Sequence, residues 1–408
     1  MIRQYNQSSE KLVKLKLATS EEFFEKINNE QNQLPVIKDD FNPLFQGCYS
    51  ARIKIKQKNK KLENLFNTSE FLNTISTFLG NKDQQFLIDK AWEPVLFNQV
   101  HDVLCGVETD EVFDNTMSRF KKAEFLADEV KEESFQKILK EIDTSGEGTS
   151  LVVFNQLNWK RKDIAWARIS FTEDVFQLNL KNSEGQAVPF QLTDIKRYQN
   201  GGIKQAQIEF IAKVPSMGYE VYKLIPHQQT EIKTDINSNQ ARNRLELEKG
   251  TDLWSGQIKS IKLKETGKEY INPELPLGNT VIKETDDGDF WEIGAPLRGA
   301  AGRPINRLFP LPDKSQADFS TDHGGTGYTS HDKIKAEFKF NQHSNLGSLT
   351  TRVTLYSGIK RIDIKTTLIN EDKGVRYRVV FPTTINKGKI VNEIPFGGTA
   401  YGIEEASQ

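Results

Sequence analysis

The feature that most constrains the fold is a change in the spacing of apolar residues near residue 145. Before this point, apolar residues recur every three or four positions, as on one face of an α-helix. After it, short runs alternate apolar and polar residues, which is typical of β-strands with one buried face. The compact segment 145–150, Ser-Gly-Glu-Gly-Thr-Ser, lies between the two patterns. The chain is therefore predicted to have a helical part followed by an all-β part.

The helical part contains three amphipathic segments. The first runs from residue 53 to Gly80, the second from about Asp83 into residues 101–102, and the third from Thr109 to about Ile142. Pro94 should bend the second helix, because proline removes a backbone hydrogen bond. Three apolar stripes joined by short turns bury one another, so we predict a three-helix domain over residues 53–144.

The β part contains many short strand-like runs separated by Gly, Asn and Asp turns. They fall at residues 151–155, 164–168, 206–210, 335–340, 349–356 and 361–369. Short strands of period two are typical of antiparallel sandwiches. We predict a first sandwich over residues 149–228 and a larger one over residues 229–408. The fold class is therefore α+β and multidomain, with a three-helix bundle followed by antiparallel β-sandwich domains.

Composition narrows the classes of partner. Lys and Arg number 55 against 56 acidic residues, a net charge of −1, so no nucleic-acid partner is expected. No apolar run is long enough to span a bilayer, so no membrane partner is expected either. Residues 1–7 lack the pattern of a signal peptide, which favours a cytoplasmic location. Cys48 and Cys105 lie far apart without Cys-x-x-Cys spacing, so we expect partly buried thiols rather than a disulfide framework.

The stretch 98–106, Asn-Gln-Val-His-Asp-Val-Leu-Cys-Gly, places a His-Asp pair where a helix ends. A neutral imidazole such as that of His101 is a good zinc ligand, and the carboxylate of Asp102 can bind substrate hydroxyls or orient the ligands. From the residues alone, a surface or capping histidine is the competing interpretation. His323 and His331 also adjoin aspartates, but there an exposed polar loop is favoured over a second metal site.

This stretch resembles the Asn-Gln-Phe-His-Asp…Gly signature of glycoside hydrolase family 38, the retaining α-mannosidases. The resemblance implies that His101 is one of four zinc ligands and that Asp102 contacts the sugar. Residues 45–52 resemble the stretch of that family that lines the mouth of the active site. The resemblance implies substrate-binding roles for three of them, with an ordinary loop as the alternative. These are Phe45, Tyr49 and Arg52.

Three segments of the β part resemble the same family: residues 154–161, 214–219 and 289–291. We expect structural roles for them, with glycine and proline setting turns and the tryptophans in the core. The β region as a whole is expected to be mannosidase-like, of the galactose-mutarotase-like type. Residues 391–398 resemble a late strand of that region, so the second sandwich is expected to be truncated.

The catalytic carboxylates of the family are not found in this sequence. Retaining glycosidases need two carboxylates about 5 Å apart, and in this family both come from a catalytic barrel. No His-x-Asp zinc motif precedes residue 50. Residues 1–52, with a strand expected at 15–18 and a helix starting at Thr19 or Ser20, are interpreted as the C-terminal remnant of a (β/α) barrel. The resemblance thus implies one zinc ion, whose other ligands lie outside this chain, and no catalytic residue within it.

Three functions remain open. The first is part of a zinc-dependent α-mannosidase acting on an α-mannoside glycan, inactive alone and completed by a barrel in cis or in trans. The second is a non-catalytic carbohydrate-binding or assembly module. The third is one subunit of a split enzyme, for which a large apolar face on residues 1–60 is the expected sign. A homo-oligomer is left open.

Overall fold

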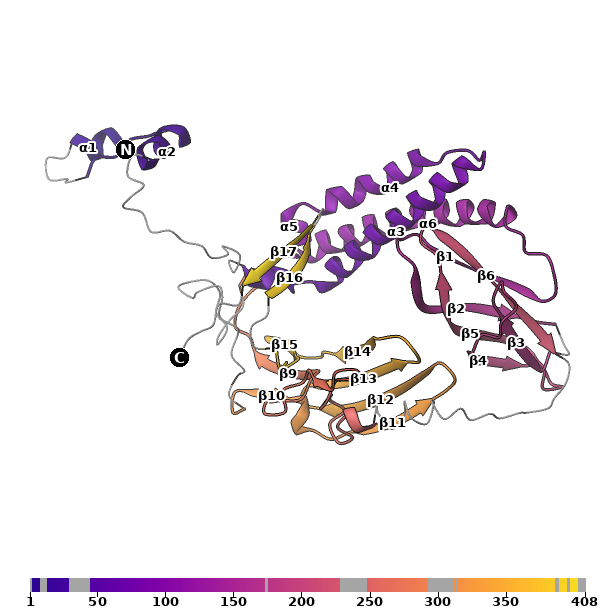
Figure 1. The fold of residues 1–408 in the computed structure, drawn as a ribbon. Coiled ribbons are helices and arrows are strands. Elements are labelled where there is room, and N and C mark those ends of the chain that lie inside the picture. Colours follow the sequence, from indigo (N-terminus) through magenta and orange to yellow (C-terminus); the bar gives the residue numbers. More distant parts are fainter. Residues whose placement is uncertain are drawn as a thin grey trace.

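The computed structural model describes residues 2–7, 13–28, 45–172, 175–227, 248–292, 312, 314–385, 389–394 and 397–402. Figure 1 shows long helices in one body and antiparallel sheets in two others. The fold class predicted from the sequence, α+β with several domains, is confirmed. The helices are α1 (Ile2–Gln7), α2 (Ser20–Asn28), η2 (Gln46–Tyr49), α3 (Ile53–Phe78), α4 (Gln85–Asn98), α5 (His101–Leu104), α6 (Asp110–Lys140) and η3 (Ser320–Asp322).

Helices α3, α4 and α6 pack around one apolar core. Its fully buried side chains include Leu62 and Phe66 of α3, Val95 of α4 and Phe120 of α6. Burying a side chain of this size contributes roughly 1.5–3 kcal/mol. The Thr109 hydroxyl accepts a hydrogen bond from an N–H of the first turn of α6, which confirms the predicted start of that helix.

The strand expected at residues 15–18 is wrong. These residues form no strand, and the side chain of Asn6 instead bonds the N–H and the C=O of Leu15, at 2.8 and 2.6 Å. The helix expected next is present, since α2 begins at Ser20 and the Thr19 hydroxyl accepts from the N–H of Glu22 at 3.2 Å. Figure 1 shows α1 and α2 apart from the other helices and from the sheets.

The first β body consists of two three-stranded antiparallel sheets, with orders β1–β6–β3 and β2–β5–β4. A core that includes Leu180, Ile208, Phe210 and Leu224 lies between them. The rings of Phe210 and Tyr222 meet edge to face at 4.7 Å. The strands are β1 (Thr149–Asn155), β2 (Arg161–Ser170), β3 (Gln177–Lys181), β4 (Phe190–Arg197), β5 (Ile203–Val214) and β6 (Gly218–His227).

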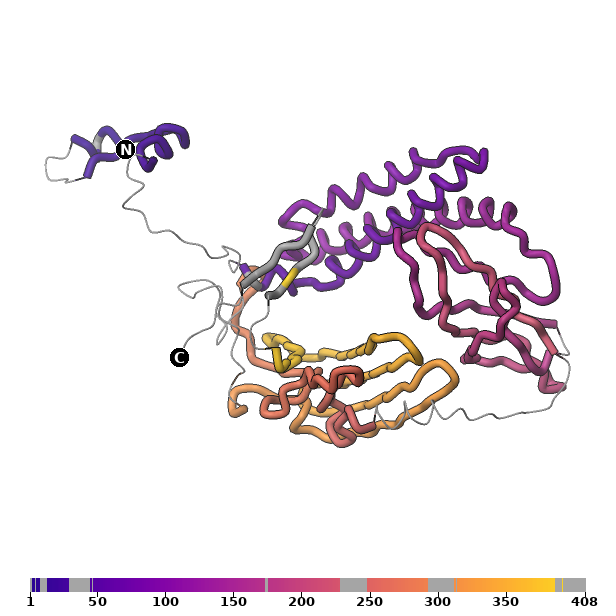
Figure 2. Tube along the Cα trace, viewed as in Figure 1, coloured from indigo at the N-terminus to yellow at the C-terminus, as the bar shows by residue number. Residues whose placement is uncertain are grey.

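The second β body contains a four-stranded sheet, β11–β12–β13–β14, and a three-stranded sheet, β10–β9–β15. Its core includes Ile258, Phe338, Phe340 and Val353. Figure 2 follows this part of the chain from one strand to the next. Its strands are β7 (Lys262–Leu263), β8 (Lys268–Glu269), β9 (Thr280–Thr285), β10 (Ala317–Phe319), β11 (Thr326–His331), β12 (Lys335–Ser344), β13 (Gly347–Tyr356), β14 (Ile362–Ile369) and β15 (Val375–Val380), of which β7 and β8 form a two-stranded sheet. Strands β16 (Lys389–Ile394) and β17 (Gly397–Gly402) form a separate two-stranded sheet, which Figure 1 draws beside the helices. The predicted border between the sandwiches, at residues 228 and 229, lies outside the described residues.

A glycine-rich segment before and within β11 lies flat on the core of this second body. A Cβ atom on Gly327 would lie 2.8 Å from the ring of Phe340 and 3.0 Å from that of Phe338. A Cβ on Gly325 would lie 2.7 Å from the Phe340 ring. The glycines of this segment therefore serve close packing.

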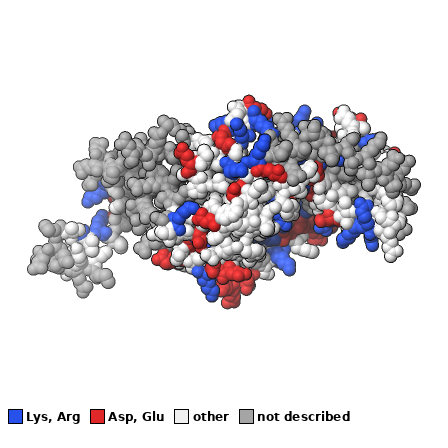
Figure 3. Space-filling view, turned by 90° about the horizontal axis from the view of Figure 1, so that it is seen from below, with Lys and Arg blue, Asp and Glu red and all other residues white. Residues whose placement is uncertain are grey.

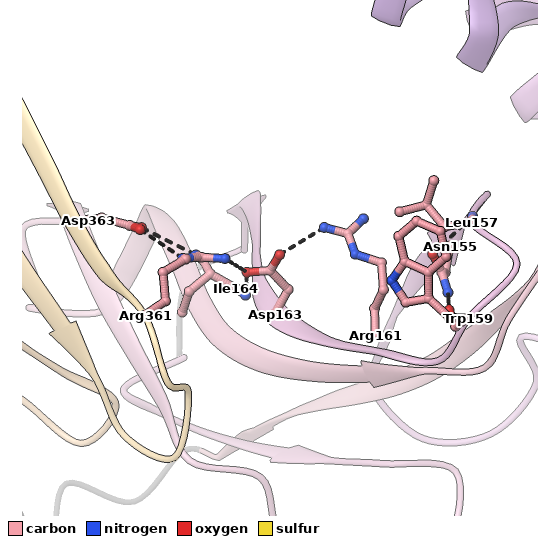
Figure 4. A network of polar contacts seen from close by, with 8 residues as sticks. All are labelled: Asn155, Leu157, Trp159, Arg161, Asp163, Ile164, Arg361 and Asp363. Carbon is pink, nitrogen blue, oxygen red and sulfur yellow. Dashed lines mark hydrogen bonds and ion pairs between the residues drawn. The ribbon is translucent and has the colours of Figure 1, made fainter. Parts of the chain in front are cut away.

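Two of the family-like segments meet in the first β body, as Figure 4 shows in part. Asn155, which is buried, donates hydrogen bonds to the carbonyl oxygens of Trp159 and Pro215, both at 2.7 Å. The expectation that the tryptophans of these segments lie in the core is wrong for Trp159 and Trp291, which are 58% and 42% exposed. Their backbone carbonyls, rather than their rings, make the anchoring contacts.

The two β bodies are joined by charged side chains (Figure 4). The Arg361 guanidinium donates to Asp163 of β2 at 2.9 Å and to Asp363 of β14 at 2.7 Å. Lys335 of β12 pairs with Glu209 of β5 at 2.5 Å. On the face drawn in Figure 3, charges of both signs are interspersed. No helix in the described ranges is long and apolar enough to cross a membrane.

Candidate functional site

The His-Asp pair lies on its own short helix, because the second predicted helix is interrupted. Helix α4 ends at Asn98, and Val100 is extended, with ψ of 137°, before α5 begins at His101. The buried Asn98 amide donates to the Thr116 carbonyl of α6 at 3.0 Å, and the Gln99 amide donates to Asn59 of α3 at 3.2 Å. Asn98 and Gln99, the first two residues of the motif, thus hold the turn between the two helices, and after Val100 the short helix α5 begins with His101 and Asp102.

His101 and Asp102 are both at the surface. Their side chains are 86% and 73% exposed, and Nε2 of His101 lies 3.5 Å from Oδ1 of Asp102. Gly106, whose φ is +77°, ends the turn and packs so closely that a Cβ there would lie 2.6 Å from the Ala51 carbonyl oxygen. The imidazole is therefore accessible while the backbone that carries it is held in place.

The residues present do not by themselves complete a zinc site. Among the described residues, no group of three or more His, Cys, Asp or Glu side chains could hold a metal ion. Zinc in proteins takes three or four protein ligands. His101 thus fits one position of a shared ligand set, with an exposed carboxylate beside it, and the remaining ligands would come from elsewhere.

Phe45 and Tyr49 lie at the two ends of η2 and expose 50% and 57% of their surfaces. Phe45 adopts a left-handed conformation, with φ of 57°. The N–H of Gly47 donates to the Trp291 carbonyl at 2.8 Å, which fixes η2 against the turn at residues 289–292. The two aromatic rings are exposed, as a role in sugar stacking would require.

Arg52 is placed differently, with only 15% of its side chain exposed. Its guanidinium donates to the Glu108 carbonyl at 3.1 Å and to the Asp110 carboxylate at 2.6 Å. It also lies over the rings of Phe113, at 4.8 Å, and Phe290, at 5.4 Å. Arg52 thus joins η2 to the start of α6 and to the second β body. Its substrate-binding role stays a prediction, because these contacts position other residues.

A polar cluster that the sequence did not indicate lies behind the His-Asp helix. The pKa of Glu108 is raised above its ordinary value, because the effect of burial exceeds the opposing effects of a hydrogen bond from Thr116 and of the charges of Arg52 and Arg119. Lys56 of α3 donates to the Cys105 carbonyl at 2.8 Å. The members of this cluster come from two segments, 52–56 and 105–119, and no local spacing indicates that the two segments meet.

Three cavities in the described part of the chain lie away from these residues, and the largest, of about 490 Å³, lies on the first β body beside Arg168 and Asp194. One of about 410 Å³ lies between the two β bodies and is lined by polar side chains that include Lys162, Glu220 and Lys333. Another of about 370 Å³ lies between the helical bundle and the first β body, beside Phe71 and Phe135. None of the three is lined by a predicted site residue.

Comparison with known proteins points to one family. Residues 43–138, which include α3, α4, α5 and most of α6, match the family model described as the alpha mannosidase middle domain. Alpha-mannosidase F of Dictyostelium discoideum is 23% identical over 219 residues, 46% of this chain and 22% of the relative. A putative mannosylglycerate hydrolase of Halalkalibacterium halodurans is 22% identical over 395 residues, 83% of this chain and 43% of the relative.

Solved structures show the same fold. A glycosyl hydrolase family 38 protein from Enterococcus faecalis superposes with a TM-score of 0.68 at 18% identity, covering 93% of this chain and 50% of its own. An alpha-mannosidase from Enterococcus faecalis V583 gives a TM-score of 0.66 at 17% identity, with 93% and 49% coverage. The chain therefore spans about half the length of these structures, and less than half of the relatives above. The resemblance seen in the motifs is confirmed: the chain is related to the glycoside hydrolase family 38 α-mannosidases, with their middle domain at residues 43–138 and a fold shared with family 38 proteins.

Proposed function

We propose that this chain supplies a zinc ligand, His101, and a sugar-binding carboxylate, Asp102, to the active site of a retaining α-mannosidase. The observation that carries the proposal is the isolated helix α5, which presents both side chains to solvent from a rigid corner. The buried Asn98 and the closely packed Gly106 hold the backbone on either side of the pair.

In this proposal the chemistry is divided between this chain and other residues. Bound zinc would polarise sugar hydroxyls, as a Lewis acid does. His101 would hold the ion through an imidazole nitrogen, and Asp102 would accept hydrogen bonds from hydroxyls of the sugar. Phe45 and Tyr49 would pack on the apolar face of the ring. The nucleophile and the acid/base would come from a (β/α) catalytic barrel in cis or in trans, so this chain is proposed to be inactive alone.

Exposed apolar side chains in two separate segments, residues 13–24 and 45–53, support a partner that covers them. Eight residues of these segments expose between 44% and 85% of their surfaces. They are Val13, Leu15, Leu17, Phe23, Phe24, Phe45, Tyr49 and Ile53. Such a concentration of apolar surface marks an interaction site. We propose that the barrel contacts it, whether the barrel belongs to the same polypeptide or to a separate one. The names of the relatives favour an α-mannoside substrate, mannosylglycerate-like molecules included.

The test is hydrolysis of a chromogenic α-mannoside with zinc, by this chain alone and with an added family 38 barrel. We expect no activity alone, activity on complementation, and a loss of at least about 100-fold in His101→Ala, because removing a ligand costs more than removing a group that orients one. His331→Ala is the matched control, since His331 is also exposed and also precedes an aspartate. Activity of the chain alone, or equal losses in both variants, would refute the proposal.

A further inference from the structure

The cavity between the two β bodies is separate from the proposed hydrolase site. It has a volume of about 410 Å³. The first body contributes the loop 182–189, between β3 and β4, together with residues of β2, β5 and β6. The second contributes Lys333 and Ile334, which precede β12, and Ser357, which follows β13. Cavities of roughly 300–1,000 Å³ at the borders of domains are usual sites for small molecules.

Direct contacts hold the two bodies together around this cavity. The ammonium group of Lys162, which lines the cavity, donates to the Gly358 carbonyl oxygen at 2.6 Å. A second contact joins Lys335 of β12 to Glu209 of β5 at 2.5 Å. These contacts cross from one body to the other and hold the two walls of the cavity at a set separation.

Each wall is also held by its own hydrogen bonds. On the first body, the N–H of Ser183 donates to the Glu220 carboxylate of β6 at 3.2 Å. On the second body, the N–H of Ser357 donates to the Ile334 carbonyl oxygen at 2.8 Å. A ligand would therefore meet walls that are already formed, which lowers the entropy cost of binding.

The buried part of the cavity wall is apolar. Tyr222 and Ile334 line it and are only 2% and 1% exposed. The Tyr222 hydroxyl is already used, since it accepts from the N–H of Lys213 at 2.8 Å and donates to the carbonyl of the same residue at 3.2 Å. Val188 and Ile211 add aliphatic surface. This wall suits the carbon skeleton of a small molecule rather than its charged group.

The exposed part of the wall carries more ammonium groups than carboxylates. Three lysines and two glutamates line the cavity: Lys162, Lys213, Lys333, Glu184 and Glu220. Lys162 and Glu220 are used by the contacts above, whereas no described residue bonds the ammonium groups of Lys213 and Lys333. One of these two lysines comes from each body. Ammonium groups bind carboxylate and phosphate oxygens through charge-assisted hydrogen bonds.

We propose that this cavity binds a small hydroxylated acid, a sugar phosphate or a sugar carboxylate, which bridges the two β bodies. Its anionic group lies with Lys213 and Lys333. Its hydroxyls bond the Gln186 amide and the Ser357 hydroxyl, and its carbon skeleton packs on the buried apolar wall. The site is independent of the proposed hydrolase activity, because no predicted site residue lines the cavity.

Isothermal titration calorimetry of the full chain, without zinc or an added barrel, tests the site. The probes are glucose 6-phosphate, glucuronate, glucose and inorganic phosphate. We expect a sugar acid to bind at least about tenfold more tightly than both glucose and inorganic phosphate, because each of these lacks either the charge or the hydroxylated skeleton. The tighter of the two sugar acids identifies phosphate or carboxylate as the anionic group.

Substitutions on both walls test the residues assigned to the ligand. The double variant Lys213→Gln, Lys333→Gln should weaken binding of the sugar acid by at least about tenfold, because it removes two charge-assisted hydrogen bonds. The matched control is Lys160→Gln, Lys373→Gln, which removes one exposed lysine from each body outside the cavity and should change the affinity by less than about twofold. Ala187→Trp, which adds bulk to the cavity wall without changing the charge, should abolish binding.

Four results would each overturn the proposal. They are no binding of either sugar acid at about 10 mM, equal affinity for glucose or inorganic phosphate, equal losses in the control pair, and unchanged affinity in Ala187→Trp. All four lysines are exposed, so their substitution leaves the core intact, and circular dichroism checks that each variant folds. A negative result in the hydrolase test would leave these measurements unaffected.

Discussion

Replacing Arg52 tests how η2 is attached to the helical bundle. Its hydrogen bond to a carbonyl oxygen is worth about 1.5–3 kcal/mol. The pair with Asp110 adds about 0–1 kcal/mol, because that carboxylate is 96% exposed. Each cation–π contact, with Phe113 and Phe290, adds about 0.5–1 kcal/mol. With incomplete additivity, Arg52→Ala should lower the free energy of unfolding by about 3 kcal/mol.

The backbone of Arg52 supplies an internal control. Its φ of 44° and ψ of 52° are left-handed, a conformation that costs a non-glycine residue about 1–2 kcal/mol. Arg52→Gly removes the same contacts but relieves this cost, so it should be about 1 kcal/mol more stable than Arg52→Ala.

Urea unfolding followed by helical circular dichroism measures these differences, with Asp110→Ala as the matched variant expected to cost less than about 1 kcal/mol. The reasoning is refuted if the glycine variant is no more stable than the alanine variant. It also fails if Asp110→Ala costs as much as Arg52→Ala, since the ion pair would then dominate.

Three further changes test the β bodies. Asn155→Ala should lower the free energy of unfolding by about 2–4 kcal/mol in urea titrations, because it leaves two backbone carbonyls without their donor; a loss below about 1 kcal/mol would contradict this. Gly325→Ala should cost about 1–3 kcal/mol, since its Cβ would lie 2.7 Å from the Phe340 ring, and an unchanged thermal midpoint would argue against that contact. Burial alone would raise the pKa of Glu269, but hydrogen bonds from Ser260 and three backbone N–H groups lower it below the ordinary value of 4.5. Its depressed pKa stabilises the fold above the unfolded pKa, and this contribution is lost as pH falls below that value, so Glu269→Gln should flatten the decline of urea midpoints between about pH 6 and about pH 3.

Local sequence was sufficient for the elements with strong periodicity. The third helix starts at Thr109 as predicted, because a capping hydroxyl and two acidic residues are local signals. Strand β5 follows the alternation of Ala206, Ile208 and Phe210, all of which are buried. The failure at residues 15–18 has a physical reason, since a strand requires a partner and Asn6 occupies the backbone groups of Leu15 instead.

The interruption of the second helix shows where local patterns cease to be sufficient. Apolar spacing continues through Val95 to Val100, so the pattern predicts one helix up to the His-Asp pair. Contacts from Asn98 to α6 and from Gln99 to α3 come from other helices and stabilise the break instead. Asn98 and Gln99 are polar, so the spacing of the apolar residues does not indicate the break that they stabilise.

The sequence by itself determined the helical and β halves, the three long helices, and the motif that points to a metal ligand and its neighbouring carboxylate. These follow from periodicity, capping and side-chain chemistry, which act over a few residues. Only the tertiary structure decided that Arg52 is held by α6 and Phe290, and that Lys56 of α3 bonds the carbonyl of Cys105. Such contacts join segments separated by whole helices or domains, and their free energy depends on burial and geometry that exist only once the chain has folded.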